Sequence, residues 1–259
     1  KGHLYIKNEQ AQETGSFKIR GALQAVLAKE KDNLPFMTRS SGNFGKALSY
    51  ATKKLGHKAI IVIPENALPK KIQGAKEYGA KVVVHGTTYQ ETIEKLEELS
   101  LEHEGIMLSP FDDLEVIKGQ ATIALEILED NSSFKYCFCP VGGGGVMAGC
   151  SFYLKEKNPS ISMIAVEPKG ACDFALSFSL KKRIKLPKTN TIADGLRTPF
   201  VGEQNWPLLS RYVDEAILVD DSKIKEAMRL IYEEHQIMLE PSGAASIAGW
   251  LAYVQKNPL

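Results

Sequence analysis

The sequence predicts an α/β protein with two domains, each a mainly parallel twisted sheet flanked by helices. Short apolar runs rich in β-branched residues alternate along the chain with longer segments in which apolar residues recur at helical spacing. Such alternation of strand and helix is typical of parallel sheets that are covered by helices. Three loops between these elements are rich in Gly and Ser, and parallel sheets place their ligand sites at the carboxyl ends of strands.

Each predicted strand is a short β-branched or aromatic run bounded by Pro, Gly or polar residues. The predicted strands cover residues 35–39, 58–64, 80–86, 105–111, 134–141, 162–168 and 215–221. The segments between them have apolar residues three or four positions apart, and two of them stop at Gly79 and Gly105, as helices commonly do. The predicted helices cover residues 46–56, 68–78, 88–105, 113–130, 146–155, 222–235 and 242–254.

The composition excludes several classes of protein. Formal net charge is +1 over 259 residues, so the chain has no bulk attraction for nucleic acid or anionic membranes. No apolar run approaches the roughly 20 residues that span a bilayer, and the first residues do not resemble a signal peptide. Scattered histidines make a zinc site unexpected. The cysteines have no C-x-x-C or disulfide pattern, and we expect core thiols in a cytoplasmic protein: Cys137, Cys139, Cys150 and Cys172.

The segment PVGGGGVMAG places four glycines, Gly142 to Gly145, between a predicted strand and a predicted helix. Without Cβ atoms, their backbone N–H groups can converge on an anion, and the helix N-terminus adds partial positive charge. The segment therefore predicts a phosphate-binding turn. Gly143, Gly145 and Ala148 also fit the dinucleotide pattern G-x-G-x-x-A. Glu167 then ends the next strand, where a ribose-binding acid would lie, so a nucleotide-dependent oxidoreductase stays open as an alternative.

Two further stretches carry groups that could act on a small ligand. In RSSGNFGKA, the residues Ser40, Ser41 and Asn43 offer hydroxyls and an amide at a helix start. This arrangement suits a carboxylate, but it also suits an ordinary helix cap. In ETGSFKIRGA, Lys18 lies between two apolar residues. Lysine acts as a nucleophile when its pKa is lowered or when its amine is already bound as an imine, and its immediate neighbours alone show neither.

Together these stretches resemble one family of enzymes. TGSFKIRGA, SSGNFGKA and PVGGGGVMAG, in that order, are similar to segments of pyridoxal-phosphate (PLP) enzymes of the tryptophan-synthase β type, called fold type II. FDDLEVIKGQATIALEI, TIADGLR and LEPSGA narrow the resemblance to the branch of serine/threonine dehydratases and serine racemases. The resemblance runs along essentially the whole chain. It implies a large cofactor-binding domain (residues 1–34 and 113–259), a small substrate-clamping domain (residues 35–112) inserted in it, and a cofactor in the cleft between them.

The resemblance also implies roles for individual residues. Lys18 would be joined covalently to the cofactor aldehyde, Phe17 would pack against the pyridine ring, and Asn43 would hydrogen-bond the ring hydroxyl. The phosphate would be bound by Gly142, Gly143, Gly144 and Gly145, and Gly195 would line the cofactor pocket. The substrate carboxylate would be held by Ser40, Ser41, Gly42 and Asn43.

The reaction that the resemblance implies is β-elimination of a hydroxy amino acid such as L-serine or L-threonine, which yields a 2-oxo acid and ammonia. Lys18 would take the proton from Cα, and the cofactor would stabilise the carbanion. Serine racemisation is the alternative, because in racemases of this branch a serine at the place of Ser41 returns a proton to the opposite face of Cα. A non-catalytic relative that binds a small ligand is a further alternative. The family also leads us to expect a homodimer.

A divalent cation site is implied as well. Metal-using members of this branch bind Mg²⁺, Mn²⁺ or Ca²⁺ through a Glu, a backbone carbonyl four residues later and an Asp two residues beyond that. EPKGACD supplies Glu167, the carbonyl of Ala171, and Asp173 at this spacing, and oxygen ligands suit a hard cation. The same residues also fit a strand end followed by a helix cap at Asp173.

Two features depart from the family pattern. Phe44 follows the loop asparagine where the family usually has His, which changes either the substrate pocket or the packing over the ring. Members also have a segment before LYIKNE and, after YVQKNPL, a strand and an SGGN-like turn that places Ser or Cys beside the pyridine nitrogen. We therefore expect that these 259 residues omit parts of the protein or that the protein lacks them, and we assign no residue to the pyridine nitrogen. No feedback-regulated domain is expected.

Overall fold

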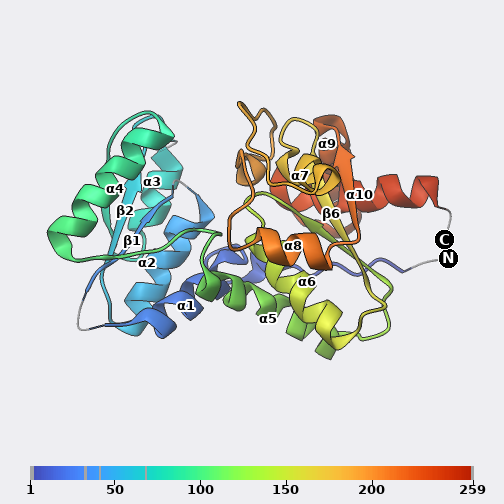
Figure 1. Ribbon diagram of the computed structural model, residues 1–259, viewed down its shortest axis with the longest axis horizontal. Helices are drawn as coiled ribbons and strands as arrows, with labels where there is room; N and C mark the ends of the chain where they lie inside the picture. The colour runs from blue at the N-terminus through green and yellow to red at the C-terminus, as the bar shows by residue number, and fades with distance from the viewer. Residues whose placement is uncertain (1–2, 32–33, 41, 68, 258–259) are drawn as a thin grey trace. The chain divides into compact units, whose positions relative to one another are not determined.

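The structure is a computed structural model that describes residues 3–31, 34–40, 42–67 and 69–257 (Figure 1). The chain forms two compact units: residues 8–120 make up the first unit, and residues 1–7 with 121–259 make up the second. Each unit contains a parallel sheet flanked by helices. The predicted α/β class is therefore confirmed. The predicted domain boundaries, with residues 35–112 as an insertion, stay a prediction.

The first unit is built on four parallel strands in the order β3-β2-β1-β4. These strands are β1 (Phe36–Arg39), β2 (Ala59–Ile63), β3 (Lys81–Val84) and β4 (Ile106–Met107). A 3-10 turn, η1 (Glu9–Ala11), comes first, and the helices are α1 (Lys18–Lys29), α2 (Asn43–Leu55), α3 (Pro69–Lys76) and α4 (Tyr89–His103). Because β4 pairs with β1 on the side away from β2, the sheet changes its winding direction between β1 and β4.

The alternating side chains of β2 serve two separate cores. Val62 packs with Leu96 and Leu99 of α4, whereas Ile61 packs with Ala75 of α3. Figure 1 shows α4 and α3 on opposite sides of β2. Every residue of β2 is buried. Because both faces of the strand are covered, its residues are apolar throughout, which explains the run AIIVI.

The second unit has a sheet of three parallel strands in the order β5-β6-β7. They are β5 (Tyr136–Pro140), β6 (Ser162–Pro168) and β7 (Glu215–Val219). Helix α5 (Leu114–Asp130) begins in the first unit and ends in the second. The other helical segments are α6 (Gly145–Lys157), α7 (Asp173–Leu180), η2 (Asp194–Leu196), α8 (Trp206–Tyr212), α9 (Asp221–His235) and α10 (Pro241–Lys256). Helix α10 packs closely on β6 at Gly249. A Cβ atom at this position would lie only 2.4 Å from Val166 Cγ2.

Some elements differ from those predicted. The strand predicted at 105–111 has two residues, Ile106–Met107, and the helices α1, α7 and α8 were not among those predicted. The helix predicted at 68–78 is present from Pro69 to Lys76, and residue 68 lies outside the described residues. No helix in the described part of the chain is both long and apolar enough to cross a membrane. All four cysteines are free thiols.

Candidate functional site

Lys18 is the first residue of α1, and its amine is held by backbone and ring contacts. Lys18 Nζ donates a hydrogen bond to the backbone oxygen of Pro110 at 2.7 Å. The same nitrogen lies 5.0 Å from the centroid of the Phe17 ring and 5.9 Å from that of the Phe44 ring. Aromatic faces within about 6 Å attract a cation, and a carbonyl oxygen accepts one of its protons. These contacts hold the amine of Lys18 in one position, whereas the amine of an ordinary surface lysine moves freely in water.

The loop after β1 lies where open parallel sheets bind their ligands. β1 pairs with β2 on one side and with β4 on the other, so the carboxyl ends of β1 and β4 form the topological switch point. Ser40 follows the end of β1, Gly42 and Asn43 begin α2, and Pro110, the partner of Lys18, follows the end of β4. The structure thus brings Lys18 and the loop 40–43 to the same edge of the first sheet.

Ser40 caps helix α2 from within this loop. Its Oγ accepts the backbone N–H groups of Gly42 at 3.3 Å and of Gly45 at 3.1 Å. Gly42 is the N-cap residue and Asn43 is the first residue of the 13-residue helix. Ser40 is thus not the N-cap itself, but its hydroxyl holds the first turn of α2, and this is compatible with anion binding because the helix N-terminus directs its partial positive charge toward the loop. Ser41 lies outside the described residues.

The tetraglycine turn, Gly142–Gly145, connects β5 with α6 and is buried. Gly144 has a φ of +95°, in the left-handed region that favours glycine. A Cβ atom at Gly144 would lie 2.8 Å from Leu209 Cδ1, and one at Gly142 would lie 2.9 Å from the backbone oxygen of Gly195. Side chains are therefore excluded from the turn, and its backbone N–H groups precede the first turn of α6. These features fit a phosphate group.

Gly195 lies in η2, next to the tetraglycine turn. Its N–H donates to Ser242 Oγ at 3.0 Å, and its carbonyl oxygen lies against Gly142. The chain before η2 is fixed by Thr191, whose hydroxyl donates to the Asp221 carboxylate at 2.5 Å. Gly142 and Gly195, both assigned to the cofactor by the family resemblance, are thus neighbours within the second unit.

Glu167 ends β6 with a buried carboxyl group that is 1% exposed. Its Oε1 accepts the N–H of Phe174 at 3.0 Å, and its Oε2 accepts the N–H of Ala175 at 2.7 Å. Burial, and then the charge of Asp173, raises the pKa of Glu167 well above its ordinary range. Because both oxygens are engaged in capping α7, Glu167 does not have the environment of a ribose-binding acid.

Asp173 forms the other half of this acid pair and is fully buried. Within the described part of the chain, neither of its carboxyl oxygens has a hydrogen-bond partner in another residue. Burial raises the pKa of Asp173 to about 7, against a smaller lowering effect of its own backbone N–H. The N-cap of α7 is Cys172, so Asp173 is not the helix cap that the sequence also allowed.

Glu167 and Asp173 fit a hard cation because the carboxyl oxygens of Asp173 have no hydrogen-bond partner among the other described residues. An ionised carboxylate without a partner is costly inside a protein, and a cation would remove that cost. The described residues contain no group of three or more His, Cys, Asp or Glu side chains suited to a metal. A cation here would therefore use the backbone carbonyl of Ala171 in addition to Glu167 and Asp173.

Two polar contacts involve residues at or near the predicted site, and no sequence pattern pointed to either. Arg20, two positions after Lys18, forms a bidentate ion pair with Glu9, with Nε–Oε2 at 2.7 Å and Nη2–Oε1 at 2.9 Å. Asn205 donates from Nδ2 to the backbone oxygen of Gly143 at 2.7 Å. The members of the second pair are 62 positions apart, so only the folded chain shows that they meet.

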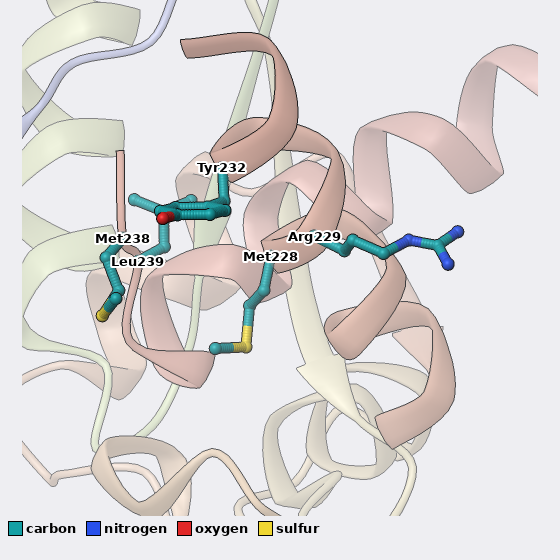
Figure 2. A pocket seen from close by; sticks show the side chains of 5 residues that line it. All are labelled: Met228, Arg229, Tyr232, Met238 and Leu239. Atoms are coloured by element: carbon teal, nitrogen blue, oxygen red, sulfur yellow. The ribbon is translucent and has the colours of Figure 1, made fainter. Parts of the chain in front are cut away.

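A cavity of about 300 Å³ lies on α9, away from these groups in the sequence. It is lined by Met228, Arg229, Tyr232, Met238 and Leu239 (Figure 2). The guanidinium of Arg229 points away from the other four side chains. The cavity is apolar and offers neither a carboxylate nor an amine, and none of the predicted site residues lines it.

The predicted site residues fall into two groups, each assembled within its own unit. The first unit contains Phe17, Lys18, Ser40, Gly42 and Asn43, and the second contains Gly142, Gly143, Gly144, Gly145, Glu167, Ala171, Asp173 and Gly195. The first group supplies a positioned amine and a loop suited to a carboxylate. The second supplies a glycine turn suited to a phosphate and a buried acid pair. These are the parts that an enzyme using a phosphorylated aldehyde cofactor requires.

Comparison with known proteins defines the class. A family model described as pyridoxal-phosphate dependent enzyme matches residues 1–259. The chain belongs to this family, and the prediction from its motifs is confirmed.

The relatives narrow the similarity further. Serine racemase of Oryza sativa subsp. indica is 39% identical over 251 residues, which cover 96% of this chain and 74% of the relative. L-threonine dehydratase catabolic TdcB of Staphylococcus aureus is 38% identical over 254 residues, which cover 97% and 73%. Among solved structures, maize serine racemase has a TM-score of 0.94 at 38% identity, covering 97% of this chain and 77% of that one. The processed form of threonine deaminase isoform 2 from Solanum lycopersicum has a TM-score of 0.95 at 36% identity, covering 98% and 71%.

Proposed function

We propose that this chain is a PLP-dependent ammonia-lyase that removes the β-hydroxyl of L-serine or L-threonine and releases a 2-oxo acid and ammonia. Serine racemisation is the second candidate activity. The proposal rests on the amine of Lys18, which is held by Pro110 at the edge of the sheet where the loop 40–43 begins. Relatives named serine racemase and L-threonine dehydratase support the two activities.

In this proposal Lys18 first binds the cofactor and then acts as the base at Cα. The bound cofactor withdraws electrons from Cα, which makes its proton removable. The amine of Lys18 accepts this proton, and the Pro110 carbonyl and two aromatic rings stabilise the ammonium that forms. The substrate carboxylate is held by Ser40, Ser41, Gly42 and Asn43.

The remaining cofactor contacts are proposed from the family resemblance. Phe17 packs on the pyridine ring, and Asn43 hydrogen-bonds the ring hydroxyl. The N–H groups of Gly142–Gly145 bind the phosphate, and Gly195 lines the pocket beside them. The tight packing behind the turn supports this role, because it holds the backbone donors in place before any ligand arrives.

Borohydride reduction provides the direct test of the proposal. It should fix the cofactor on Lys18, and peptide mapping should find the adduct there. The Lys18→Ala variant should lose both the visible absorbance and keto-acid formation, whereas Lys53→Ala, at an exposed lysine of α2, should keep them. An adduct on another lysine, or no keto acid from any hydroxy amino acid, would disprove the proposed function.

Ser41 is the residue that would permit racemisation, although dehydratases with serine at this place also occur. We propose that its hydroxyl returns a proton to the face of Cα opposite Lys18, as in racemases of this branch. Incubation with L-serine, followed for both pyruvate and D-serine, measures the balance directly. Ser41→Ala should reduce D-serine formation more than pyruvate formation. Equal loss of the two products would contradict a proton-donor role for Ser41.

A divalent cation is proposed at Glu167, the carbonyl of Ala171 and Asp173. The unpartnered carboxyl oxygens of Asp173 support it. Mg²⁺, Mn²⁺ or Ca²⁺ should raise the melting temperature of the protein, and Asp173→Asn should abolish the increase. An increase of the same size in Asp173→Asn would place the cation elsewhere.

Three further proposals have different grounds. From the family resemblance we infer a homodimer and a division into a small domain of residues 35–112 and a large domain formed by the rest, and from the cysteine pattern we infer a cytoplasmic location. Sedimentation of the purified protein tests the first, and limited proteolysis with mapping of the cut sites tests the last.

A further inference from the structure

Asn205 is a buried polar residue that none of the sequence patterns contains, and it contacts the tetraglycine turn from behind. It lies immediately before α8 and has no exposed surface. Its Nδ2 donates to the backbone oxygen of Gly143 at 2.7 Å. The N–H of Gly202 donates to the same oxygen at 3.0 Å. Both acceptor positions of this carbonyl are therefore occupied by donors from the segment 202–205.

The orientation of that carbonyl sets the orientation of the next N–H group. No peptide bond in the described residues is cis, so the C=O of Gly143 and the N–H of Gly144 point in opposite directions across one planar unit. Since the C=O is directed toward Asn205, the N–H of Gly144 is directed toward the other face of the turn. A peptide flip would exchange the two and present a carbonyl oxygen to an anion.

The packing of Gly144 shows that the side facing Asn205 is closed. A Cβ atom at Gly144 would lie 2.8 Å from Leu209 Cδ1, 3.1 Å from Val201 Cγ1 and 3.2 Å from Asn205 Cβ. The segment 201–209 thus fills the space behind the turn. This side of the turn therefore has no room for a phosphate.

We propose that Asn205 is a positioning residue for phosphate binding: by holding the Gly143 carbonyl behind the turn, it keeps the Gly144 N–H directed at the phosphate of the cofactor. This inference rests on the proposed PLP function and adds a residue to its site. A neutral amide suits the task, because it donates to a carbonyl without placing a charge in a buried position.

The test compares PLP with pyridoxal, which lacks the phosphate. In Asn205→Asp, the carboxylate has nearly the same shape but cannot donate to the Gly143 oxygen. The Kd for PLP should rise about 5- to 100-fold, the cost of one lost buried hydrogen bond, while the Kd for pyridoxal should change about 2-fold or less. The phosphorus-31 NMR signal of bound PLP should shift in the variant. Asn158→Asp, at a surface asparagine, adds the same charge and should change neither Kd.

A second measurement on the unaltered protein covers the case in which Asn205→Asp does not fold. The Gly144 amide signal should move downfield when PLP or inorganic phosphate binds. An unmoved Gly144 amide, or equal losses of affinity for PLP and pyridoxal in Asn205→Asp, would overturn the inference while PLP binding by the wild type still stood. A wild-type protein that binds no PLP would overturn the proposed function together with this inference.

Discussion

Replacing Glu9 by Gln should lower the free energy of unfolding by about 2–4 kcal/mol, because the Glu9–Arg20 pair is bidentate and nearly buried. The side chains of Arg20 and Glu9 are 10% and 14% exposed, and their two contacts measure 2.7 Å and 2.9 Å. Removing one partner of a fully buried pair costs about 3–5 kcal/mol, and an exposed pair contributes about 0–1 kcal/mol. Because both side chains are little exposed, the loss for the Glu9–Arg20 pair should be close to that of a fully buried pair.

Urea denaturation followed by circular dichroism measures the change in the free energy of unfolding. The matched control is Glu226→Gln, which breaks a single 2.7 Å contact between Lys223 and Glu226, side chains that are 52% and 47% exposed. The control should lower the free energy of unfolding far less, because water screens an exposed pair. Exchanging both members of the buried pair, in Glu9→Leu with Arg20→Met, should recover part of the loss. Equal effects of Glu9→Gln and Glu226→Gln would refute the reasoning from burial.

Three further predictions concern single residues. Gly144→Ala should lower the free energy of unfolding through two terms: about 1–2 kcal/mol for a left-handed alanine, and about 1–3 kcal/mol for the clash with Leu209. Calorimetry measures the sum, and an unchanged melting temperature would contradict the observed φ of +95°. In the cofactor-free protein, Phe44→Leu should raise the rate of Lys18 methylation at pH 8 about 2- to 5-fold, since one cation–π contact no longer stabilises the unreactive ammonium. Phe44→Tyr should keep the wild-type rate, and a rate unaffected by Phe44→Leu would exclude the contact. Burial raises the pKa of Cys139 well above its ordinary range, so its thiol stays protonated at pH 8. Disulfide reagents should label Cys139 in urea and spare it in the native protein, and rapid native labelling would show that it is not buried.

The strands were predictable from the sequence where burial on both faces demands a continuous apolar run. The run predicted at 162–168 coincides with β6, and the run at 58–64 contains β2. The strand predicted at 105–111 is much shorter, because the chain leaves the sheet after Leu108 and turns at Ser109, whose hydroxyl accepts the N–H of Asp112. Helix α8 escaped prediction because seven residues are too few for a clear helical period.

In the candidate site, the residues that lie in local sequence motifs could be predicted, and the residues that meet them only in the folded chain could not. Groups that would touch a ligand lie in short segments whose residue types are constrained by the chemistry, and these segments carried the resemblance to the PLP family. The supporting residues have no such local pattern. Asn205 meets Gly143 across 62 positions, and Ser242 meets Gly195 across 47, so neither contact can be inferred before the chain is folded.

The shortness of strand β4 affects Lys18, because the amine of Lys18 donates to the carbonyl of Pro110, which follows this strand. Strand β4 pairs with β1 through Ile106 and Met107, and the N–H of Leu108, which donates to the backbone oxygen of Met37 at 2.8 Å, ends this ladder. Local opening is least costly where few backbone bonds must break, so this margin should exchange its amide hydrogens sooner than the four-residue pairing of β1 with β2. The carbonyl that anchors Lys18 can thus be released by a small excursion of one loop while the rest of the sheet stays closed.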